Sequence, residues 1–471
     1  MNTIKTELIV IGAGSGGLSV AAGAAQMGKD VTLFEKGKMG GDCLNYGCVP
    51  SKSLIAAASR AHAMAHPGVF GIGPVAPEID FAAVNAHVHQ VIAAIEPHDS
   101  QERFEGFGVK VVREAAAFSG KRTVVAGDTQ YEAKHIVVST GSRAAIPPIP
   151  GLETVPYLTN ETVFNLTERP DHLIVIGGGP IGVELGQAHR RLGSDVTLIE
   201  GFKVMGKDDP ELVAVVLEAI KADGIDVREG AKVASVSGEA GAITVTLEGG
   251  ETVNGSHLLL AAGRQPNVDG LNLEAAGIAY TKQGISVDGR LRTSNSRVYA
   301  IGDVAGGLQF THVAGYHAGI AVRNILFKVP AKADTSAIPW VTYTDPELAH
   351  VGMTEAEARK AYGDKATVVR WALDENDRAQ AERDTRGFIK AVIGPGGRIK
   401  GASIVGAKAG ELIQPWVLAL SQKLKISAFT GMVAPYPTRG EIGKRAAGAY
   451  YTPVLFSQRT QNIVRLLGVF D

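Results

Sequence analysis

The chain has 471 residues, of which 45% are hydrophobic and 20% are charged, and its formal net charge is -1. This length exceeds the size at which one hydrophobic core keeps growing, so we expect two to four domains. The balanced charge leaves no electrostatic footprint for nucleic acid or for an anionic membrane, and we therefore expect small-molecule chemistry.

The number of cysteines and the polarity of the first residues indicate the cellular compartment. Two cysteines cannot staple a secreted protein of this length, and residues 1–7 are polar and lack a signal peptide's apolar run. The longest apolar runs are interrupted by glycine or charge well short of a membrane span. We therefore expect a cytoplasmic protein with no membrane span and no nucleic acid partner.

A glycine motif opens the chain. Residues 6–11 form an apolar run, readable as a buried strand, and Gly12, Gly14 and Gly17 follow it as G-x-G-x-x-G before an Ala-rich helical segment. These glycines permit a tight turn, close approach of a pyrophosphate and close helix packing, with the phosphates at the helix N-terminus. The next strand ends in Glu35, whose carboxylate can accept hydrogen bonds from a ribose.

The same construction recurs 165 residues later, with Gly177, Gly179, Gly182 and Glu200 in the matching positions. This internal repeat predicts two dinucleotide-binding folds in one chain, hence two different dinucleotides. The alternative is that the second repeat is a degenerate packing copy.

Three further apolar strands end in glycine turns, near residues 138, 260 and 300. After the last of them, Asp303 could bind a polyol chain, although taken alone an ordinary helix N-cap is the simpler interpretation. The turns contain Thr140 and Gly141, Gly263 and Arg264, and Gly302 and Asp303.

Both cysteines of the chain, Cys43 and Cys48, lie five positions apart. In one regular helix their Cα atoms would be about 8 to 9 Å apart, beyond the roughly 7 Å limit for a disulfide. A bond therefore requires a break before Cys48, and neighbouring glycines such as Gly47 allow one. A helix beginning near Cys48 would favour a thiolate there. The spacing alone leaves two unreactive buried thiols equally open.

The character of the sequence changes near residue 338. Residues 340–343, 388–392 and 399–404 are interpreted as strands and 412–424 as a helix, which predicts an α+β domain. Residues 429–441 are expected to form a rigid proline-containing loop before another helix. The final segment is mildly basic, and we expect a solvated helical face there rather than a ligand site.

Taken together, these motifs resemble those of the FAD-dependent pyridine nucleotide-disulfide oxidoreductases of the glutathione reductase and dihydrolipoamide dehydrogenase group, over essentially the whole chain. The resemblance implies an α/β fold with two Rossmann-like dinucleotide-binding domains, one for FAD and one for NAD(P), and a C-terminal α+β dimerisation domain. The implied boundaries are 1–150 and 269–337 for the FAD-binding and central parts, 151–268 for the NAD(P)-binding domain and 338–471 for the dimerisation domain.

The resemblance also implies roles for individual residues. FAD is assigned to the first repeat, with Glu35 on the adenosine ribose and Asp303 on the ribityl side, and the nicotinamide cofactor to the second repeat. Cys43 and Cys48 become a redox-active disulfide, with Cys48 nearer the flavin and Cys43 exchanging with substrate. Lys52 is expected near the flavin, paired with Glu184. No metal site is expected.

The residue that ends the second repeat bears on the choice between NADH and NADPH. The charge of Glu200 would repel a 2'-phosphate, and Gly201 and Phe202 after it offer no arginine clamp. NADH is therefore favoured, although Lys203 leaves NADPH open.

One motif departs from the family pattern. Dihydrolipoamide dehydrogenases and glutathione reductases carry His-Pro-Thr-x-x-Glu, whose histidine reaches the partner subunit's disulfide as a base, whereas this chain has Tyr436 in that position and keeps Glu441. A phenol with an ordinary pKa near 10 is a poor proton acceptor at pH 7. Mercuric reductases resemble this Ala-Pro-Tyr run, but they also carry a C-terminal cysteine pair that the final residues here lack.

Three functions follow for a homodimer whose active site is shared between subunits. The first is a dihydrolipoamide dehydrogenase-like flavoprotein that moves electrons between NAD(H), FAD, the cysteine pair and a small disulfide or dithiol. The second is an NAD(P)H-dependent reductase of mercuric or cupric ions. The third is a flavin-bound redox sensor with little turnover.

Overall fold

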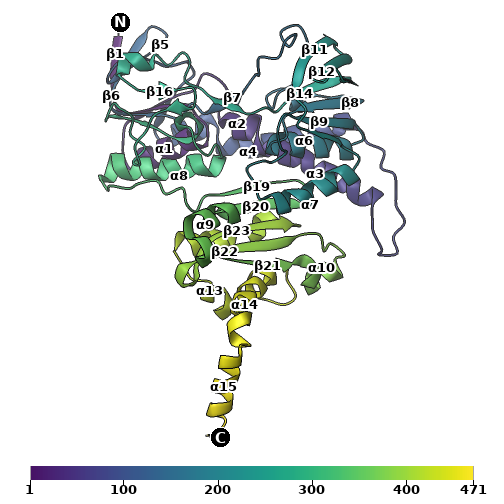
Figure 1. Cartoon of the computed structure of the whole chain (residues 1–471). Coiled ribbons are helices and arrows are strands. Elements are labelled where there is room, and N and C mark those ends of the chain that lie inside the picture. Colours follow the sequence, from purple (N-terminus) through teal and green to yellow (C-terminus); the bar gives the residue numbers. More distant parts are fainter. Residues whose placement is uncertain (1, 470–471) are drawn as a thin grey trace. The chain divides into compact units, whose positions relative to one another are not determined.

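The computed structural model describes residues 2–469 and divides into two compact units (Figure 1). The first unit comprises residues 2–63, 76–201 and 227–334. The second comprises residues 64–75, 202–226 and 335–469. The predicted fold class is confirmed, whereas the predicted domain boundaries stay predictions.

The first unit contains a seven-stranded sheet built around β1 (Asn2–Ile11). β1 pairs in parallel with β2 (Val31–Phe34) and β6 (Thr129–Val138), and β18 (Val298–Ala300) pairs in parallel with β6. The strand order is β3-β2-β1-β6-β5-β4, with β18 beside β6. This parallel core is the arrangement predicted from the first glycine motif.

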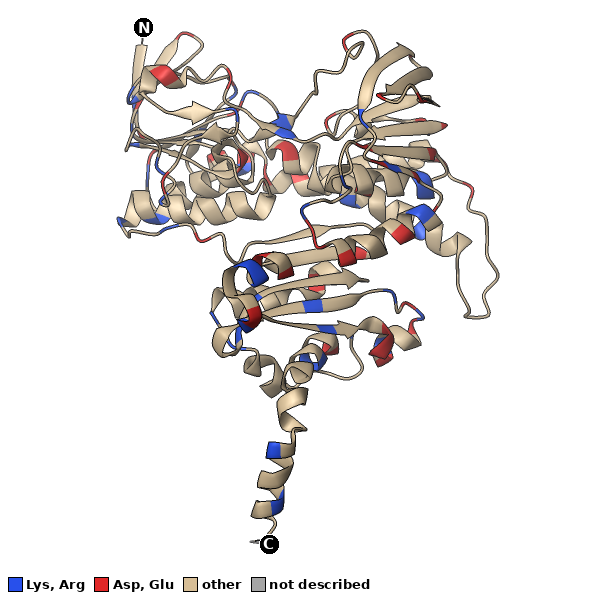
Figure 2. Ribbon diagram, in the orientation of Figure 1, with Lys and Arg blue, Asp and Glu red and all other residues tan. Residues whose placement is uncertain are grey.

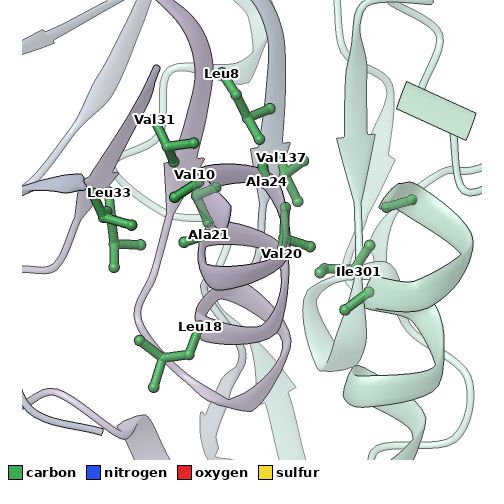
Figure 3. Close-up of a cluster of buried hydrophobic side chains, with 14 of the residues drawn as sticks. Leu8, Val10, Leu18, Val20, Ala21, Ala24, Val31, Leu33, Val137 and Ile301 are labelled. Carbon is green, nitrogen blue, oxygen red and sulfur yellow. The ribbon is translucent and has the colours of Figure 1, made fainter. Parts of the chain in front are cut away.

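Helix α1 (Ser15–Gln26) covers one face of this sheet. Its side chains Leu18, Val20 and Ala24 are buried against sheet residues such as Val10 and Leu33, as Figure 3 shows. Burying each large aliphatic side chain contributes about 1.5 to 3 kcal/mol. The packing fixes the start of α1, and hence the glycine loop, against the end of β1.

A second parallel arrangement lies in the same unit. β8 (His172–Ile176) pairs with β9 (Asp195–Glu200) and β14 (His257–Leu260), giving the order β10-β9-β8-β14 with β10 (Asp226–Glu229) at one edge. Helix α6 (Pro180–Arg191) follows β8. The repeat predicted from the sequence is thus a repeat of strand, glycine loop and helix.

A short ribbon joins two of the glycine turns. β7 (Ser142–Ala144) pairs antiparallel with β15 (Arg264–Pro266), so the segment after Gly141 lies beside the segment after Gly263. Thr140 Oγ1 donates a hydrogen bond to Asn267 O at 2.7 Å. Nothing local in the sequence predicts this pairing.

The second unit is built on a five-stranded antiparallel sheet in the order β19-β20-β23-β22-β21. Its strands are β19 (Pro339–Thr342), β20 (Glu347–Gly352), β21 (Thr367–Ala372), β22 (Phe388–Gly394) and β23 (Arg398–Gly406). The sequence predicted three of these strands and missed β20 and β21.

Two predictions in this unit need correction. The helix expected at 412–424 is two short helices, α11 (Ala409–Leu412) and α12 (Gln414–Ser421), because Pro415 suits the first turn of a helix and not its interior. The loop expected at 429–441 begins later, since α13 (Ser427–Gly431) occupies its start.

The C-terminal segment is helical. α14 (Glu441–Leu455) buries Ile442, Ala446 and Ala447 in the core of the second unit, and α15 (Gln458–Leu467) has no buried residue. None of the helices formed by residues 2–469 is long and apolar enough to cross a membrane.

The remaining elements complete the two units. The helices are α2 (Gly41–Asn45), α3 (Cys48–Ala65), α4 (Phe81–Ile95), α5 (Gln101–Gly106), α7 (Pro210–Ala222), α8 (Thr311–Val322), α9 (Glu355–Tyr362) and α10 (Asp377–Ala381). The strands are β3 (Val109–Val112), β4 (Ala117–Gly120), β5 (Thr123–Ala126), β11 (Val233–Glu239), β12 (Ala242–Leu247), β13 (Thr252–Gly255), β16 (Tyr280–Thr281) and β17 (Gly284–Ile285).

Candidate active site

The two glycine loops have the same backbone shape. Gly12 and Gly177 have φ of +103° and +116°, and a Cβ at either position would lie 2.5 Å from Ser139 O or 2.4 Å from Ala261 O. A side chain is thus excluded by both conformation and space. The matching constraint at positions 165 residues apart argues against a degenerate second copy.

The third glycine of each motif allows the helix to approach the strand. A Cβ at Gly17 would lie 1.9 Å from Gly12 O, and a Cβ at Gly182 would lie 1.9 Å from Gly177 O. Helix α1 begins after Gly14 and helix α6 begins after Gly179. Neither helix has a side-chain hydrogen bond at its N-terminus. The backbone N–H groups of these first turns, apart from Pro180, which has none, therefore form a suitable donor set for a phosphate.

The acids that end the second strands bind back to these loops. Glu35 Oε2 accepts a hydrogen bond from Ala13 N at 2.7 Å, and Glu200 Oε2 accepts one from Gly178 N at 2.8 Å. The two carboxylates thus occupy equivalent places beside the two loops. Each acid is held where a bound nucleotide's ribose would lie in such a fold.

The two thiols lie on consecutive helices separated by a break. Cys43 is within the short helix α2, and Cys48 is the first residue of α3. Between them, a Cβ at Gly47 would lie 2.9 Å from Asp42 Oδ2 and 3.1 Å from Asp42 O, so a side chain there would require its neighbours to shift. The helix break before Cys48 and the helix start at Cys48 match the sequence prediction.

The thiols differ in acidity. A hydrogen bond from Cys43, helped by Thr311 and by the charge of Lys52, lowers the pKa of Cys48 to about 6. The same hydrogen bond and burial raise the pKa of Cys43. Cys48 Sγ lies 3.4 Å from Thr311 Oγ1, at the start of α8. In the dithiol state the negative charge therefore belongs to Cys48 and the proton to Cys43.

Lys52 lies one turn after Cys48 on α3. Its Nζ is 2.8 Å from Oε2 of Glu184, a carboxylate on α6 that is only 6% exposed. The ion pair implied by the family resemblance is therefore present. It supplies a fixed positive charge near Cys48, while its role in turnover stays a prediction.

A half-buried arginine links the cysteine segment to Asp303. Arg264 Nη2 lies 3.1 Å from Asp42 Oδ2, and its Nε donates to Ser142 Oγ at 2.8 Å. Ser142 Oγ in turn donates to Asp303 Oδ2 at 2.5 Å. Burial raises the pKa of Asp303, and the Ser142 hydrogen bond and the Arg264 charge oppose that rise.

Sequence reasoning missed several residues at this site. Asp42 was an unassigned position within the cysteine motif, and its Oδ1 accepts a hydrogen bond from the buried Asn160 at 3.1 Å. Asn160 and Thr311 carry no local signal, because they lie 118 and 263 positions from Asp42 and Cys48. Only the carboxylate beside Cys43 could have been noticed in advance.

The remaining predicted residues occupy the glycine turns of the first unit. Thr140 exchanges hydrogen bonds with Asn267, since Asn267 Nδ2 donates to Thr140 O at 2.9 Å. Gly141, Gly263 and Gly302 all have positive φ, of +68°, +127° and +67°. These turns lie at the carboxyl ends of parallel strands, where ligands bind in such sheets.

Tyr436 and Glu441 belong to the second unit. Tyr436 is 70% exposed, and its hydroxyl donates to Asp377 Oδ2 at 3.0 Å, which raises the pKa of the phenol. Glu441 is the first residue of α14. Arg439, between them, pairs with Glu382 at 2.8 Å. Tyr436 is therefore a hydrogen-bond donor and not a proton acceptor near neutral pH.

No group of three or more His, Cys, Asp or Glu side chains suited to a metal ion occurs within residues 2–469. Cys43 and Cys48 are the two thiols that the chain offers to a soft metal ion.

This combination of two dinucleotide loops and a thiol pair defines a nucleotide-dependent thiol oxidoreductase as the class of protein. Residues 6–318 match the family model described as pyridine nucleotide-disulphide oxidoreductase, and residues 338–447 match the dimerisation domain of the same family. The chain belongs to this family.

Individual relatives differ in their names. The chain is 36% identical to a mercuric reductase of Lysinibacillus sphaericus, over 95% of this chain and 83% of that protein. It is equally 36% identical to a dihydrolipoyl dehydrogenase of Geobacillus stearothermophilus, over 96% and 97%. A copper(II) complex of the HOCl-induced flavoprotein disulfide reductase RclA from Escherichia coli has a TM-score of 0.85 at 28% identity, covering 93% and 99%.

Members of this family bind FAD and a pyridine nucleotide. The residues present fit both groups: each glycine loop excludes side chains, leaves uncapped helix N–H groups and has an acid beside it. The protein is thus an enzyme of a family that exchanges electrons between nucleotides and thiols. Its dimerisation domain indicates a homodimer.

Proposed function

We propose that the protein is a homodimeric disulfide reductase that takes electrons from NADH through FAD to a Cys43–Cys48 disulfide and passes them to a small disulfide substrate. The observation that supports this most is the unequal thiol pair: Cys48 has a pKa lowered to about 6 and shares a hydrogen bond with Cys43. Both glycine loops lie in the same compact unit as these thiols.

In the thiol chemistry, the disulfide bond of the substrate is broken and the Cys43–Cys48 disulfide bond is formed. Cys43 gives its proton to the hydrogen-bonded Cys48 thiolate, attacks one sulfur of the substrate disulfide and forms a mixed disulfide, and the released substrate thiolate takes up that proton and leaves Cys48 as the thiolate again. The Cys48 thiolate then attacks Cys43 Sγ, which releases the second substrate thiolate and restores the Cys43–Cys48 disulfide. The sum is NADH, a proton and a disulfide giving NAD+ and two thiols.

The cofactor would be held by residues of the first unit. We assign its phosphates to the loop of Gly12, Gly14 and Gly17, its adenosine ribose to Glu35 and its ribityl chain to Asp303. When bound, FAD supplies the chemistry that accepts a hydride from the reduced nicotinamide and delivers two electrons to the disulfide. Lys52 stabilises negative charge developing near Cys48.

Thiol labelling tests the proposal without an acceptor. Anaerobic FAD-loaded protein is mixed with one equivalent of NADH, alkylated with iodoacetamide and analysed by mass spectrometry. We expect two new alkyl groups, on Cys43 and Cys48, and none when NADH is omitted. A Cys48→Ser variant that retains FAD should gain no NADH-dependent label. Unchanged labelling of the wild-type protein by NADH would refute the disulfide mechanism.

Glu200 supports NADH as the donor. Its carboxylate, held at the Gly178 N–H, would repel the 2'-phosphate of NADPH. We expect NADH to reduce the enzyme at least about tenfold faster than NADPH, and Glu200→Ala to narrow that ratio. Asp195→Asn, at the other end of β9, is the charge-matched control and should leave the ratio unchanged. Equal rates for both nucleotides in the wild-type enzyme would contradict the assignment.

A second candidate substrate is a soft metal ion, Hg(II) or Cu(II), and Tyr436 favours it. We place Tyr436 and Glu441 of one subunit beside the thiol pair of the other, as the family resemblance implies. With its raised pKa, Tyr436 cannot take the proton that Cys43 must lose to attack a disulfide. A thiophilic cation displaces that proton itself when it binds both sulfurs, and two electrons reduce one Hg(II) to Hg(0) or two Cu(II) to Cu(I).

A panel of acceptors separates the candidates. NADH oxidation is measured with lipoamide, glutathione disulfide, Cu(II) and Hg(II), each for the wild type and for Cys43→Ser. Turnover with a disulfide that disappears in the variant supports the first candidate, and metal-dependent turnover that disappears supports the second. Rates below about 1 per second with every acceptor would favour a redox sensor.

A further inference from the structure

We propose that the C-terminal helix α15 binds the surface of an anionic lipid bilayer through an apolar face that the rest of the described chain leaves uncovered. This proposal concerns where the enzyme works and does not depend on its electron acceptor. The apolar tail face is defined as Ile463, Val464, Leu466 and Leu467 of α15 together with Leu455 and Phe456, which precede that helix.

The tail face is exposed although it is apolar. Phe456 is 73% exposed, Val464 is 63% exposed and Leu466 is 64% exposed. The helix before it is anchored, because α14 buries Ile442 and Ala446 in the core of the second unit. Beyond Tyr451 no residue up to 469 is buried. An apolar surface of this kind on an ordered helix indicates an interaction site.

The apolar residues of α15 share one side of the helix. At 100° per residue, Ile463, Val464, Leu466 and Leu467 fall within an arc of about 160°, which is the width of an amphipathic face. The opposite arc carries Gln458, Gln461, Asn462 and Arg465, whereas Arg459 and Thr460 lie within the apolar arc. Ser457 caps the helix by accepting a hydrogen bond from Thr460 N, so α15 begins at a defined residue. The helix is too short to span a bilayer, and its pattern is that of an interfacial helix.

The charge of the segment is uniformly positive. From Ile442 to Val469 the chain contains Lys444, Arg445, Arg459 and Arg465 and no acidic residue, and Figure 2 shows blue and no red along α15. Within residues 2–469, neither Arg459 nor Arg465 pairs with a carboxylate. The side chain of Arg459 can reach lipid phosphates while the apolar residues insert, and Arg465 on the opposite side of the helix adds to the attraction by the anionic surface. This local excess of positive charge is not visible in the net charge of the whole chain, which is -1.

A second copy of the chain is the other occupant to consider, and two observations disfavour it. The match to the family's dimerisation domain ends at residue 447, before the tail face begins. A twofold contact between two tail faces would also enclose Arg459 of both copies, cations for which residues 442–469 offer no carboxylate partner. An anionic lipid surface complements the same charges.

Cosedimentation of the FAD-loaded full chain with vesicles tests the proposal. We expect binding to phosphatidylcholine vesicles that contain phosphatidylglycerol, little binding to phosphatidylcholine alone, and loss of binding at high salt. Arg459→Gln with Arg465→Gln should weaken binding about 25-fold, from about fivefold for each cationic side chain. Ile463→Ser with Leu467→Ser should weaken it at least about tenfold.

The control is Lys282→Gln with Lys365→Gln, which removes two charges from exposed positions elsewhere and should bind like the wild type. Absence of phosphatidylglycerol-dependent binding by the wild type overturns the proposal, as does equal weakening by the control. Sedimentation equilibrium of the Ile463→Ser, Leu467→Ser variant tests whether the tail face contacts a second copy of the chain instead of a lipid surface. If that variant becomes monomeric, the tail face belongs to a second copy and the proposal is wrong.

Discussion

Cys48 and its neighbours show how one side chain acquires a charge. Its position at the first residue of α3, the hydrogen bond from Cys43 and the contact with Thr311 all favour the thiolate over the thiol. Asp42 acts in the opposite direction on both thiols. The acidity of the pair is therefore set by a balance that single substitutions can shift either way.

Replacement of Thr311 should raise the pKa of Cys48. In the wild type, the reduced enzyme should react with iodoacetamide at Cys48 with a midpoint near pH 6, and the reaction should fall away below it as the thiolate is protonated. Thr311→Val removes a donor to the thiolate, so the midpoint should rise by about one unit. Alkylation rate against pH, followed by mass spectrometry, measures it. Thr281→Val, at an exposed position, should not move the midpoint.

Replacement of Asp42 should shift the same midpoint downward. Asp42→Asn keeps the shape of the side chain but removes a negative charge that raises the pKa of both cysteines. The same alkylation profile should therefore move to lower pH, opposite to Thr311→Val. Asp128→Asn, at an exposed turn, is the matched control. An upward shift for Asp42→Asn would show that its contacts with Arg264 and Asn160 matter more than its charge.

Among the elements, β22 carries a buried cation in the second unit. Lys390 is 5% exposed, and its Nζ lies 2.9 Å from Asp209, 3.0 Å from Glu211 and 3.1 Å from Glu355. Burial opposes its charge, but the hydrogen bonds to these carboxylates outweigh burial and raise the pKa of Lys390. Asp209 also caps α7, so this cluster ties α7 to the sheet within that unit.

Removal of this cation should destabilise the protein strongly. Lys390→Met leaves the buried carboxylate of Asp209 without its partner, which costs about 3 to 5 kcal/mol. Urea unfolding of the FAD-loaded protein at fixed concentration measures the change. Lys365→Met at an exposed position should change stability by less than about 0.5 kcal/mol. Addition of Asp209→Asn to Lys390→Met should restore part of the loss, and a further loss instead would contradict the charge argument.

Local signals in the sequence account for the elements that the prediction found. Gly12 and Gly177 are readable because a left-handed backbone position that also touches a neighbouring strand tolerates only glycine. The start of α3 is readable because Pro50 suits a first turn. The pairing of β7 with β15 was not predictable, since it joins residues about 120 positions apart through backbone hydrogen bonds that any sequence can form. The contacts of Asn160 and Thr311 escape prediction for the same reason.

At the scale of the whole molecule, residues 338–447 match the family's dimerisation domain, so exposed apolar residues in this range are candidates for the dimer contact. Val433 is 91% exposed in the segment that leads to Tyr436. Such exposure is costly unless another surface covers it. We expect the second 49.2 kDa chain of a homodimer to provide that surface.

A charge at this position should weaken the dimer. Val433→Glu would bury an unpaired carboxylate in the contact, and we expect the dimer dissociation constant to rise at least about tenfold. Sedimentation equilibrium over a dilution series measures it. Val329→Glu, at an exposed position outside the matched dimerisation residues, should have no effect. An unchanged constant for Val433→Glu would place the dimer contact elsewhere.

The cluster around Lys390 also limits how this chain can be recombined with its relatives. A chimera that exchanges residues 151–268 to change nucleotide preference would carry a foreign residue at position 209 into contact with the native Lys390. If the donor has no acid there, the graft leaves the buried Lys390 with Glu355 but without the buried carboxylate of Asp209, however well its glycine loop folds. Positions 209 and 390 must therefore be exchanged together, which makes them a compatibility pair for engineering the enzyme.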